Sequence, residues 1–162
     1  MLIDNSLILD NAFTLTTTGS STNYIDTIGA AGGQAQISGV NTIQGGGDAY
    51  ISLWFEAIVI AAMTAGGTSL DVSLWTSDIS AASIWTTGNA TTSITAGSAT
   101  VKMLGSGTIA AASLTKGAVL IKARLPVGLK RFLAAYYTCV GTFSGSGTLT
   151  TVLVPDVDIN LT

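Results

Sequence analysis

Histidine is absent from the 162-residue sequence, and cysteine occurs once, as Cys139. Without histidine, the common Cys/His zinc frameworks and the histidine-based nucleophilic triads cannot form. A single cysteine also rules out an intrachain disulfide. Cys139 stands in the apolar run Phe132 to Val140, so we expect a small buried side chain and no reactive thiol. We therefore expect neither an enzyme nor a bound cofactor or metal.

Charge is equally scarce, because only 9% of the residues are charged while 48% are hydrophobic. The surface must then consist largely of Thr, Ser, Gly, Asn and Ala. Such a surface suits contact with another protein, since burying uncharged side chains avoids the cost of desolvating charges. The net charge of −3 argues against nucleic acid as a partner, because phosphate binding requires a basic face.

No segment is typical of a membrane span or a signal peptide. The sequence begins with an acid at Asp4 and lacks the basic start of a signal peptide. The longest apolar run, Ile51 to Ala65, contains Glu56 and is shorter than the ~20 residues that a membrane helix needs. We expect a soluble protein that is made in the cytoplasm and does not bind membranes.

The charges are segregated along the chain. Residues 1 to 101 contain no Lys or Arg, and all six cations lie between Lys102 and Arg131. Seven acids precede them, and Asp156 and Asp158 follow. Two interpretations stay open: neighbouring strands pair these charges within one domain, or the cations form a polarised surface that docks on an acidic partner. Asp156 and Asp158 themselves are expected to be solvated in an extended tail.

Period-2 alternation, β-branched residues and Gly/Ser/Asn punctuation recur along the chain and predict an all-β fold. We expect one domain over residues 1–162, a jelly-roll-like antiparallel β-sandwich with extended tails at 1–6 and 155–162. For the stretch Ala57 to Ala65 a short helix is the alternative. The predicted strands are Ser6 to Asp10, Phe13 to Thr17, Asn23 to Thr27, Tyr50 to Ile60, Ser69 to Thr76, Ser98 to Leu104, Gly107 to Ala111, Ala118 to Arg124, Phe132 to Val140 and Thr148 to Val154.

Alternation within these strands predicts which side chains share a face. Leu70, Val72 and Leu74 fall on one side of their strand, so Trp75 points to the other side. In the segment Val119 to Arg124, Val119, Ile121 and Ala123 are predicted to face inward. Lys122 and Arg124 are then predicted to lie together on the opposite face. The strand Ile51 to Val59 is apolar on both faces apart from Glu56, which is typical of a central strand or of one covered by a partner.

The segment from Lys122 to Tyr137 indicates a strand, a turn and a second strand. Pro126 fixes φ in the turn, and Gly128 supplies the positive φ that the reversal needs. Together with Leu7 to Ala12 and Ser20 to Asp26, this segment resembles the capsid cement (decoration) proteins of short-tailed Bordetella bacteriophage and related phages. The matching late positions are Arg124, Leu125, Pro126, Gly128, Arg131, Phe132, Leu133 and Tyr137. The resemblance spans roughly residues 6 to 155.

This resemblance implies a jelly-roll-like sandwich on the outer surface of a phage head, where it cements neighbouring major capsid protein subunits. It also implies self-association, with a homodimer favoured over a trimer. The sequence departs from the family by a longer Gly-rich insertion at Gly29 to Gly47 and an extra segment around Ile84 to Gly97. Alternative functions are another virion β-protein, such as a tail tube or fibre component, and a carbohydrate-binding β-sandwich module.

Candidate contact residues follow from the aromatic and basic content of the chain. The three tryptophans, Trp54, Trp75 and Trp85, are either core residues or interface anchors. Arg131 either docks on an acidic surface or pairs internally with an acid of the first half of the chain, and Lys130 is expected to be solvated. The residues predicted to contact the capsid or a second copy are Trp54, Trp75, Lys122, Arg124, Lys130 and Arg131.

Overall fold

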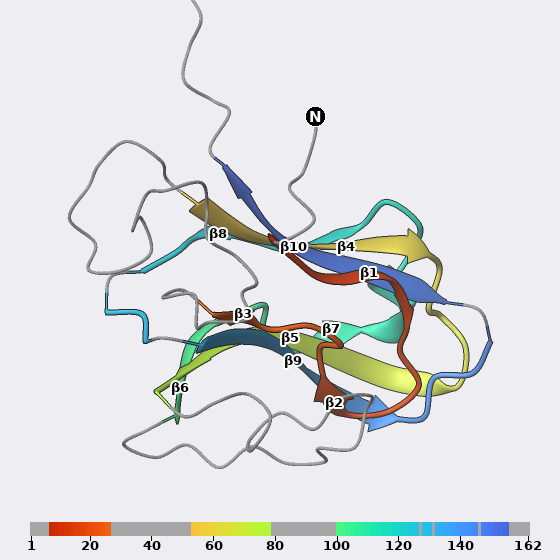
Figure 1. Ribbon diagram of the computed structural model, residues 1–162. Helices are drawn as coiled ribbons and strands as arrows, with labels where there is room; N and C mark the ends of the chain where they lie inside the picture. The colour runs from red at the N-terminus through yellow and green to blue at the C-terminus, as the bar shows by residue number, and fades with distance from the viewer. Residues whose placement is uncertain are drawn as a thin grey trace, which may run out of the picture.

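The computed structural model describes residues 7–26, 53–78, 100–126, 128–130, 132–145 and 147–155. The strands in these ranges form two antiparallel sheets that lie face to face (Figure 1). A short 3-10 turn covers Ala111–Ser113. The predicted all-β class and the sandwich arrangement are therefore confirmed. Among the described residues, no helix has the length and apolar character that a membrane crossing requires.

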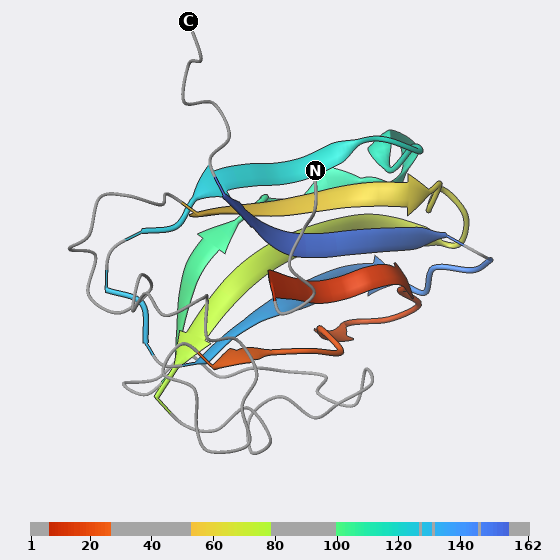
Figure 2. The ribbon, with the colours of Figure 1, turned by 45° about the horizontal axis from the view of Figure 1, so that its top comes forward.

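The first sheet, sheet A, has four strands. In spatial order they are β1 (Ile8–Thr14), β10 (Thr148–Pro155), β4 (Leu53–Ala61) and β8 (Val119–Arg124). Figure 2 shows this order from the red strand β1 to β8 at the far edge. The two ends of the described chain thus pair with each other in β1 and β10, and β8 is one of the two edge strands.

The second sheet, sheet B, has β9 (Phe132–Gly141) and β5 (Gly67–Ser77) at its centre. Two short strands, β2 (Gly19–Ser20) and β3 (Ile25–Asp26), pair with β9 on one side. On the other side, β5 pairs with β6 (Thr100–Gly105) and β7 (Ile109–Ala110). The β5 and β9 strands pair over nearly their whole length and form the central pair of this sheet.

The core lies between the sheets and is built from alternate residues of the central strands. Leu70, Val72 and Leu74 of β5 are fully buried, which confirms their predicted inward face. Alternate residues of β4, β9 and β10 meet them from both sheets. They are Leu53, Phe55, Ala57, Val59, Leu133, Ala135, Tyr137, Leu149 and Leu153. Because each strand contributes every second side chain, the remaining side chains form the two outer faces.

Two boundaries near the N-terminus differ from the prediction. Ser6 to Asp10 and Phe13 to Thr17 are not separate strands, because β1 continues from Ile8 to Thr14 and ends three residues before the predicted Thr17; Ser6 lies outside the described residues. The pairing of β1 with β10 slips between Asp10 and Phe13, and Ala12 takes a φ of 48° within this bulge. The Ala12 N–H donates to Thr150 Oγ1 at 3.0 Å, which keeps the bulged backbone bonded to β10.

Other predicted boundaries change by smaller amounts. The helical alternative for Ala57 to Ala65 is wrong, since β4 extends to Ala61. Pro155 belongs to β10, so the predicted tail loses its first residue. The sequence did not predict β2, whose Gly19 and Ser20 carry no strand signal and are ordered by pairing with β9. Gly128 has a φ of 83°, as the predicted turn requires.

Candidate functional site

A buried polar cluster connects the two sheets at one edge of the sandwich. Asp10 of β1 is 1% exposed and accepts hydrogen bonds from the Thr22 N–H, at 2.9 Å, and from the Tyr137 hydroxyl. Thr151 Oγ1 lies 2.8 Å from the Tyr137 oxygen and donates to it, because the single phenolic proton is used on Asp10. Burial raises the pKa of Asp10, and its hydrogen bonds to Tyr137 and Thr22 oppose that shift.

The segment that follows β2 extends this connection along the same edge. The Ser21 N–H donates to Ala135 O at 2.9 Å, and the Ala135 N–H returns a bond to Ser21 Oγ at 3.1 Å. The Asn23 N–H then donates to Leu9 O at 3.0 Å, which reaches across to β1 of sheet A. The early motif residues and Tyr137 of the late motif are thus close together in space. Their contacts hold the two sheets together.

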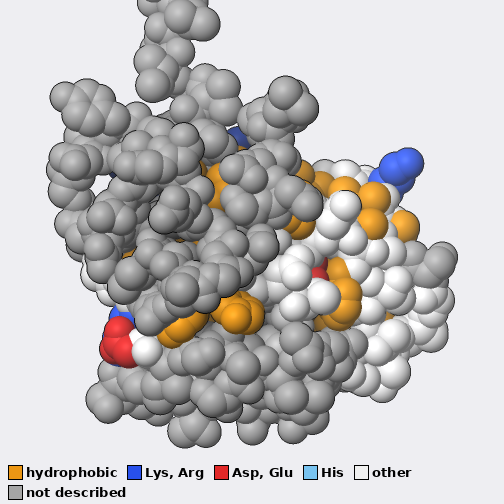
Figure 3. Space-filling model, in the orientation of Figure 1, with side chains coloured by type: hydrophobic (Ala, Val, Ile, Leu, Met, Phe, Trp, Pro, Cys, Tyr) orange, Lys and Arg blue, Asp and Glu red, His pale blue; other side chains and the backbone are white. Residues whose placement is uncertain are grey.

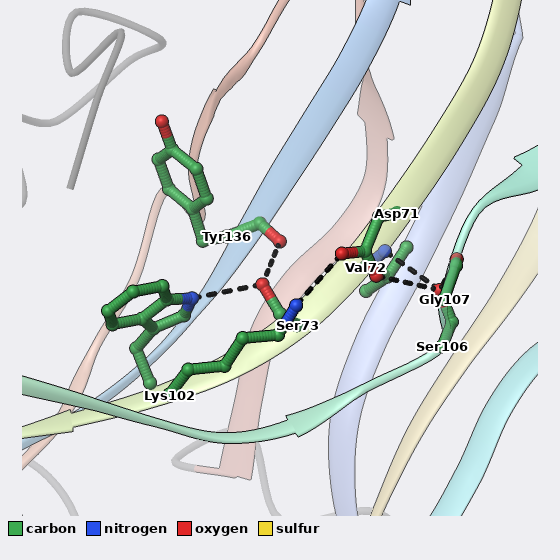
Figure 4. A network of polar contacts seen from close by, with 8 residues as sticks. Asp71, Val72, Ser73, Lys102, Ser106, Gly107 and Tyr136 are labelled. Carbon is green, nitrogen blue, oxygen red and sulfur yellow. Dashed lines mark hydrogen bonds and ion pairs between the residues drawn. The ribbon is translucent and has the colours of Figure 1, made fainter. Parts of the chain in front are cut away.

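The outer face of sheet B carries a second network (Figure 4). Trp75 points away from the core, as predicted, yet it is only 8% exposed. Its Nε1–H donates to Ser73 Oγ at 3.0 Å, and Ser73 Oγ donates to Tyr136 O at 3.0 Å. The Trp75 and Tyr136 rings make an edge contact with centroids 6.3 Å apart. The indole of Trp75 is therefore occupied within the chain, which favours a packing role over a partner contact.

Two of the basic residues pair with acids from the first half of the sequence. Lys102 Nζ lies 2.9 Å from Asp71 Oδ2 on the neighbouring strand β5. Lys130 Nζ lies 2.9 Å from Asp78 Oδ2, and the Lys130 side chain is 19% exposed. The interpretation that separated charges pair within the domain is correct for these two lysines. Lys130, expected to be solvated, is instead half-buried in an ion pair.

Lys122 and Arg124 differ from those lysines. Both side chains are exposed on the outer face of sheet A, and neither takes part in an ion pair within the described ranges. On the adjacent strand β4, Glu56 stands opposite Lys122 and Trp54 stands opposite Arg124. The predicted grouping of Lys122 with Arg124 on one face is thus confirmed. Val119, predicted to face inward with Ile121, is 54% exposed, because the pairing of β8 with β4 shifts between Ala57 and Ile58.

Apolar side chains continue this outer face toward the end of β4. Ile58 is half-buried opposite Val119, and Ile60 is 42% exposed. Figure 3 shows hydrophobic side chains at the upper right of the molecule, over the end of β4 and the turn that leads into β8. We name the outer-face residues that pair between these two strands the β8 surface. It consists of Trp54, Glu56, Ile58, Val119, Lys122 and Arg124.

Trp54 lies near the start of the central strand β4, between Arg124 of β8 and Val154 of β10. Its side chain is half-buried, and its buried Nε1–H has no hydrogen-bond partner among the residues that the structure describes. An unsatisfied buried donor costs about 1–3 kcal/mol. The indole N–H of Trp54 thus lacks a described acceptor, whereas the indole N–H of Trp75 donates to Ser73.

Two observations bear on metal and thiol chemistry in the described ranges. They contain no cluster of three or more His, Cys, Asp or Glu residues that could hold a metal ion. The Cys139 side chain is half-buried against the core, and desolvation raises the pKa of its thiol to about 11. Such a thiol is protonated at neutral pH and is a weak nucleophile. Cys139 is thus half-buried and not fully buried as expected, and the raised pKa of its thiol agrees with the expected low reactivity.

Several predicted residues lie outside the described ranges. Arg131 and Trp85 are among them, as are Asp156, Asp158 and the insertions at Gly29 to Gly47 and Ile84 to Gly97. Of the six predicted contact residues, the structure brings Trp54, Lys122 and Arg124 together and places Trp75 and Lys130 elsewhere. No protein-family model and no curated protein matches this sequence.

Proposed function

We propose that the chain is a structural protein of a bacteriophage virion that binds the outer surface of the head and cements neighbouring major capsid protein subunits. The resemblance of its early and late motifs to capsid decoration proteins supports this role. The low charge of the chain supports it as well, because a cement protein works through broad contact surfaces and needs no polar pocket. In this proposal the chain is made in the host cytoplasm, acts without catalysis and associates with itself, with a dimer favoured.

We further propose that the sandwich is a jelly roll. In a jelly roll the chain is wound as one long folded ribbon, so that the first strand pairs with the last and each next strand pairs one step further inward. If β2 with β3, and β6 with β7, each count as one strand, the described pairs follow this rule. They are β1 with β10, β2/β3 with β9, β4 with β8, and β5 with β6/β7.

The observation that carries the functional proposal is the division of the cations. Lys102 and Lys130 are used in ion pairs within the chain, whereas Lys122 and Arg124 face outward beside apolar Ile58 and Val119. Exposed cations next to an apolar patch suit a protein partner of acidic character. The β8 surface is therefore the proposed contact with the shell.

The test is co-sedimentation with purified, undecorated heads of the phage that carries the gene. The variant Lys122→Gln with Arg124→Gln removes two positive charges, which changes the net charge from −3 to −5. The matched control, Val140→Glu with Thr142→Glu, adds two negative charges on exposed positions at and just beyond the end of β9 in sheet B and gives the same net charge.

The wild-type chain and the control should sediment with the heads, and the double glutamine variant should lose at least about tenfold in affinity, or 1.4 kcal/mol. All three proteins should keep the same melting temperature. A wild-type chain that stays in the supernatant contradicts the cement role. Equal binding of the glutamine variant and the control shows that the β8 surface is not the contact.

A further inference from the structure

Within the described residues, the edge of β8 that faces away from β4 is unpaired, and its backbone groups follow a regular pattern. The Leu125 N–H donates to Leu53 O at 2.9 Å, which identifies Leu53 and Leu125 as a hydrogen-bonded pair of the β4–β8 ladder. Such pairs alternate with non-bonded pairs along antiparallel strands. Ala123 and Ile121 therefore exchange bonds with β4, while the N–H and C=O groups of Lys122 and Arg124 point away from it.

These outward-pointing groups meet no other strand within the described part of the chain. There β8 pairs with β4 alone and stands at the end of sheet A (Figure 2). The unpaired N–H and C=O groups of Lys122 and Arg124 thus form a template for one more strand. The same two residues carry the exposed cations of the β8 surface, so backbone and side-chain groups would act on one partner segment.

A second copy of β8 is a poor occupant of this edge. If two β8 strands met antiparallel through these groups, Lys122 would stand opposite Lys122 or opposite Arg124 of the other copy. Like charges directly opposite each other destabilise a pair of strands, and edge lysines commonly prevent such pairing. An acidic strand is favoured for the same electrostatic reason.

We infer that the free edge of β8 binds an extended segment of the partner protein in which acidic and apolar residues alternate, so that sheet A gains a strand. In antiparallel pairing, acidic residues of that segment would stand opposite Lys122 and Arg124 on the outer face. Its apolar residues would face inward and cover Ile121 and Ala123, which are only half-buried at this edge. This inference rests on the proposed docking role of the β8 surface and adds how the partner is bound.

The first experiment measures amide hydrogen exchange by NMR on the wild-type chain, with and without a short synthetic peptide in which valine and aspartate alternate. In the free protein, the Lys122 and Arg124 amides should exchange fast, whereas those of Ile121 and Ala123 should be protected by β4. At a peptide concentration of about ten times Kd, exchange at Lys122 and Arg124 should slow about tenfold. A peptide with lysine in place of aspartate should produce no protection.

The second experiment separates backbone pairing from charge. Lys122→Pro and Lys122→Ala lose the same charge, but only the proline variant loses the N–H that points to the free edge. Proline is tolerated on edge strands where its N–H side faces solvent, so both variants should fold. Lys122→Pro should bind the acidic peptide at least about tenfold more weakly than Lys122→Ala.

Absence of peptide binding, or binding without protection of the Lys122 and Arg124 amides, overturns the inference. The inference is also overturned if a folded Lys122→Pro variant binds the acidic peptide as tightly as Lys122→Ala. If Lys122→Pro fails to fold, the exchange measurement on the wild-type chain decides alone. Binding to heads without protection of residues 119–124, measured by mass spectrometry, leaves the docking role intact and rejects strand addition. Protection by the peptide without binding to heads rejects the docking role instead.

Discussion

Tyr137 on β9 donates its phenolic proton to the carboxylate of Asp10 on β1 and thereby joins the two sheets through buried atoms. Both residues are almost fully buried, and Phe13 stacks on the Tyr137 ring with centroids 6.0 Å apart. No basic side chain of the described residues takes part in this contact. The buried carboxylate of Asp10 is therefore stabilised by the hydrogen bonds that Tyr137 and Thr22 donate to it.

Replacing Tyr137 with Phe should lower the free energy of unfolding by about 1–3 kcal/mol, because Asp10 loses a donor and keeps its burial. Urea unfolding followed by fluorescence at neutral pH measures the change. Tyr24→Phe is the control, since Tyr24 is 41% exposed, and it should stay within about 0.5 kcal/mol of the wild type. A loss below that margin in Tyr137→Phe contradicts the stabilising role of the contact.

The same cluster predicts a dependence of stability on pH. Because burial raises the pKa of Asp10 above its ordinary value of 3.8, the folded state binds the proton more tightly than the unfolded state. The contribution of Asp10 to stability is then fully present below pH 3.8 and is lost as the pH rises through the folded pKa. Asp10→Asn cannot titrate, so its free energy of unfolding relative to the wild type should rise between acidic and neutral pH. A constant difference across that range contradicts the raised pKa.

Ala12 is the one described non-glycine residue with a positive φ, at 48°. The left-handed region costs an L-residue roughly 1–2 kcal/mol, and glycine avoids that cost. Because the Ala12 side chain is exposed, Ala12→Gly should raise the free energy of unfolding by about 0.5–1 kcal/mol. Ala110→Gly is the matched control at φ −65° and ψ 143°, and it should be destabilising. A destabilised Ala12→Gly protein shows that the bulge is not strained.

Much of the fold was predictable because alternation is a local property of the sequence. The strands from β5 to β10 begin and end within about two residues of their predicted ranges. The end of β4 was predicted to the same precision, and its predicted start at Tyr50 lies outside the described residues. The failures near the N-terminus have a common cause. The bulge at Ala12 and the strand β2 exist only through pairing with β10 and β9, which adjacent residues do not encode.

The candidate surface was predictable in part. Alternation placed Lys122 and Arg124 together, and the uneven distribution of charge along the chain indicated ion pairs between its halves. The sequence could not assign each cation to one of these two roles, because ion pairing depends on register. Asp71 meets Lys102 only because β5 and β6 are neighbours, and no sequence signal shows that the backbone groups of Lys122 and Arg124 point away from β4.

Single lysine variants should separate the two roles. Lys130→Gln breaks the pair with Asp78 and should cost about 0.2–1 kcal/mol of stability while head binding is retained. Lys122→Gln should leave stability within about 0.5 kcal/mol of the wild type and weaken head binding. Thermal unfolding and co-sedimentation on the same preparations give both quantities. Loss of head binding in Lys130→Gln alone would reverse the assignment.

A cryo-electron microscopy map of heads incubated with the purified chain tests the central claim most directly. The account predicts one sandwich-shaped density on the outer surface between neighbouring capsid subunits, with β8 and its Lys122 and Arg124 side chains against an acidic segment of the shell. Heads without added density, or a sandwich bound through the β2/β3 side of sheet B with β8 facing solvent, would contradict it.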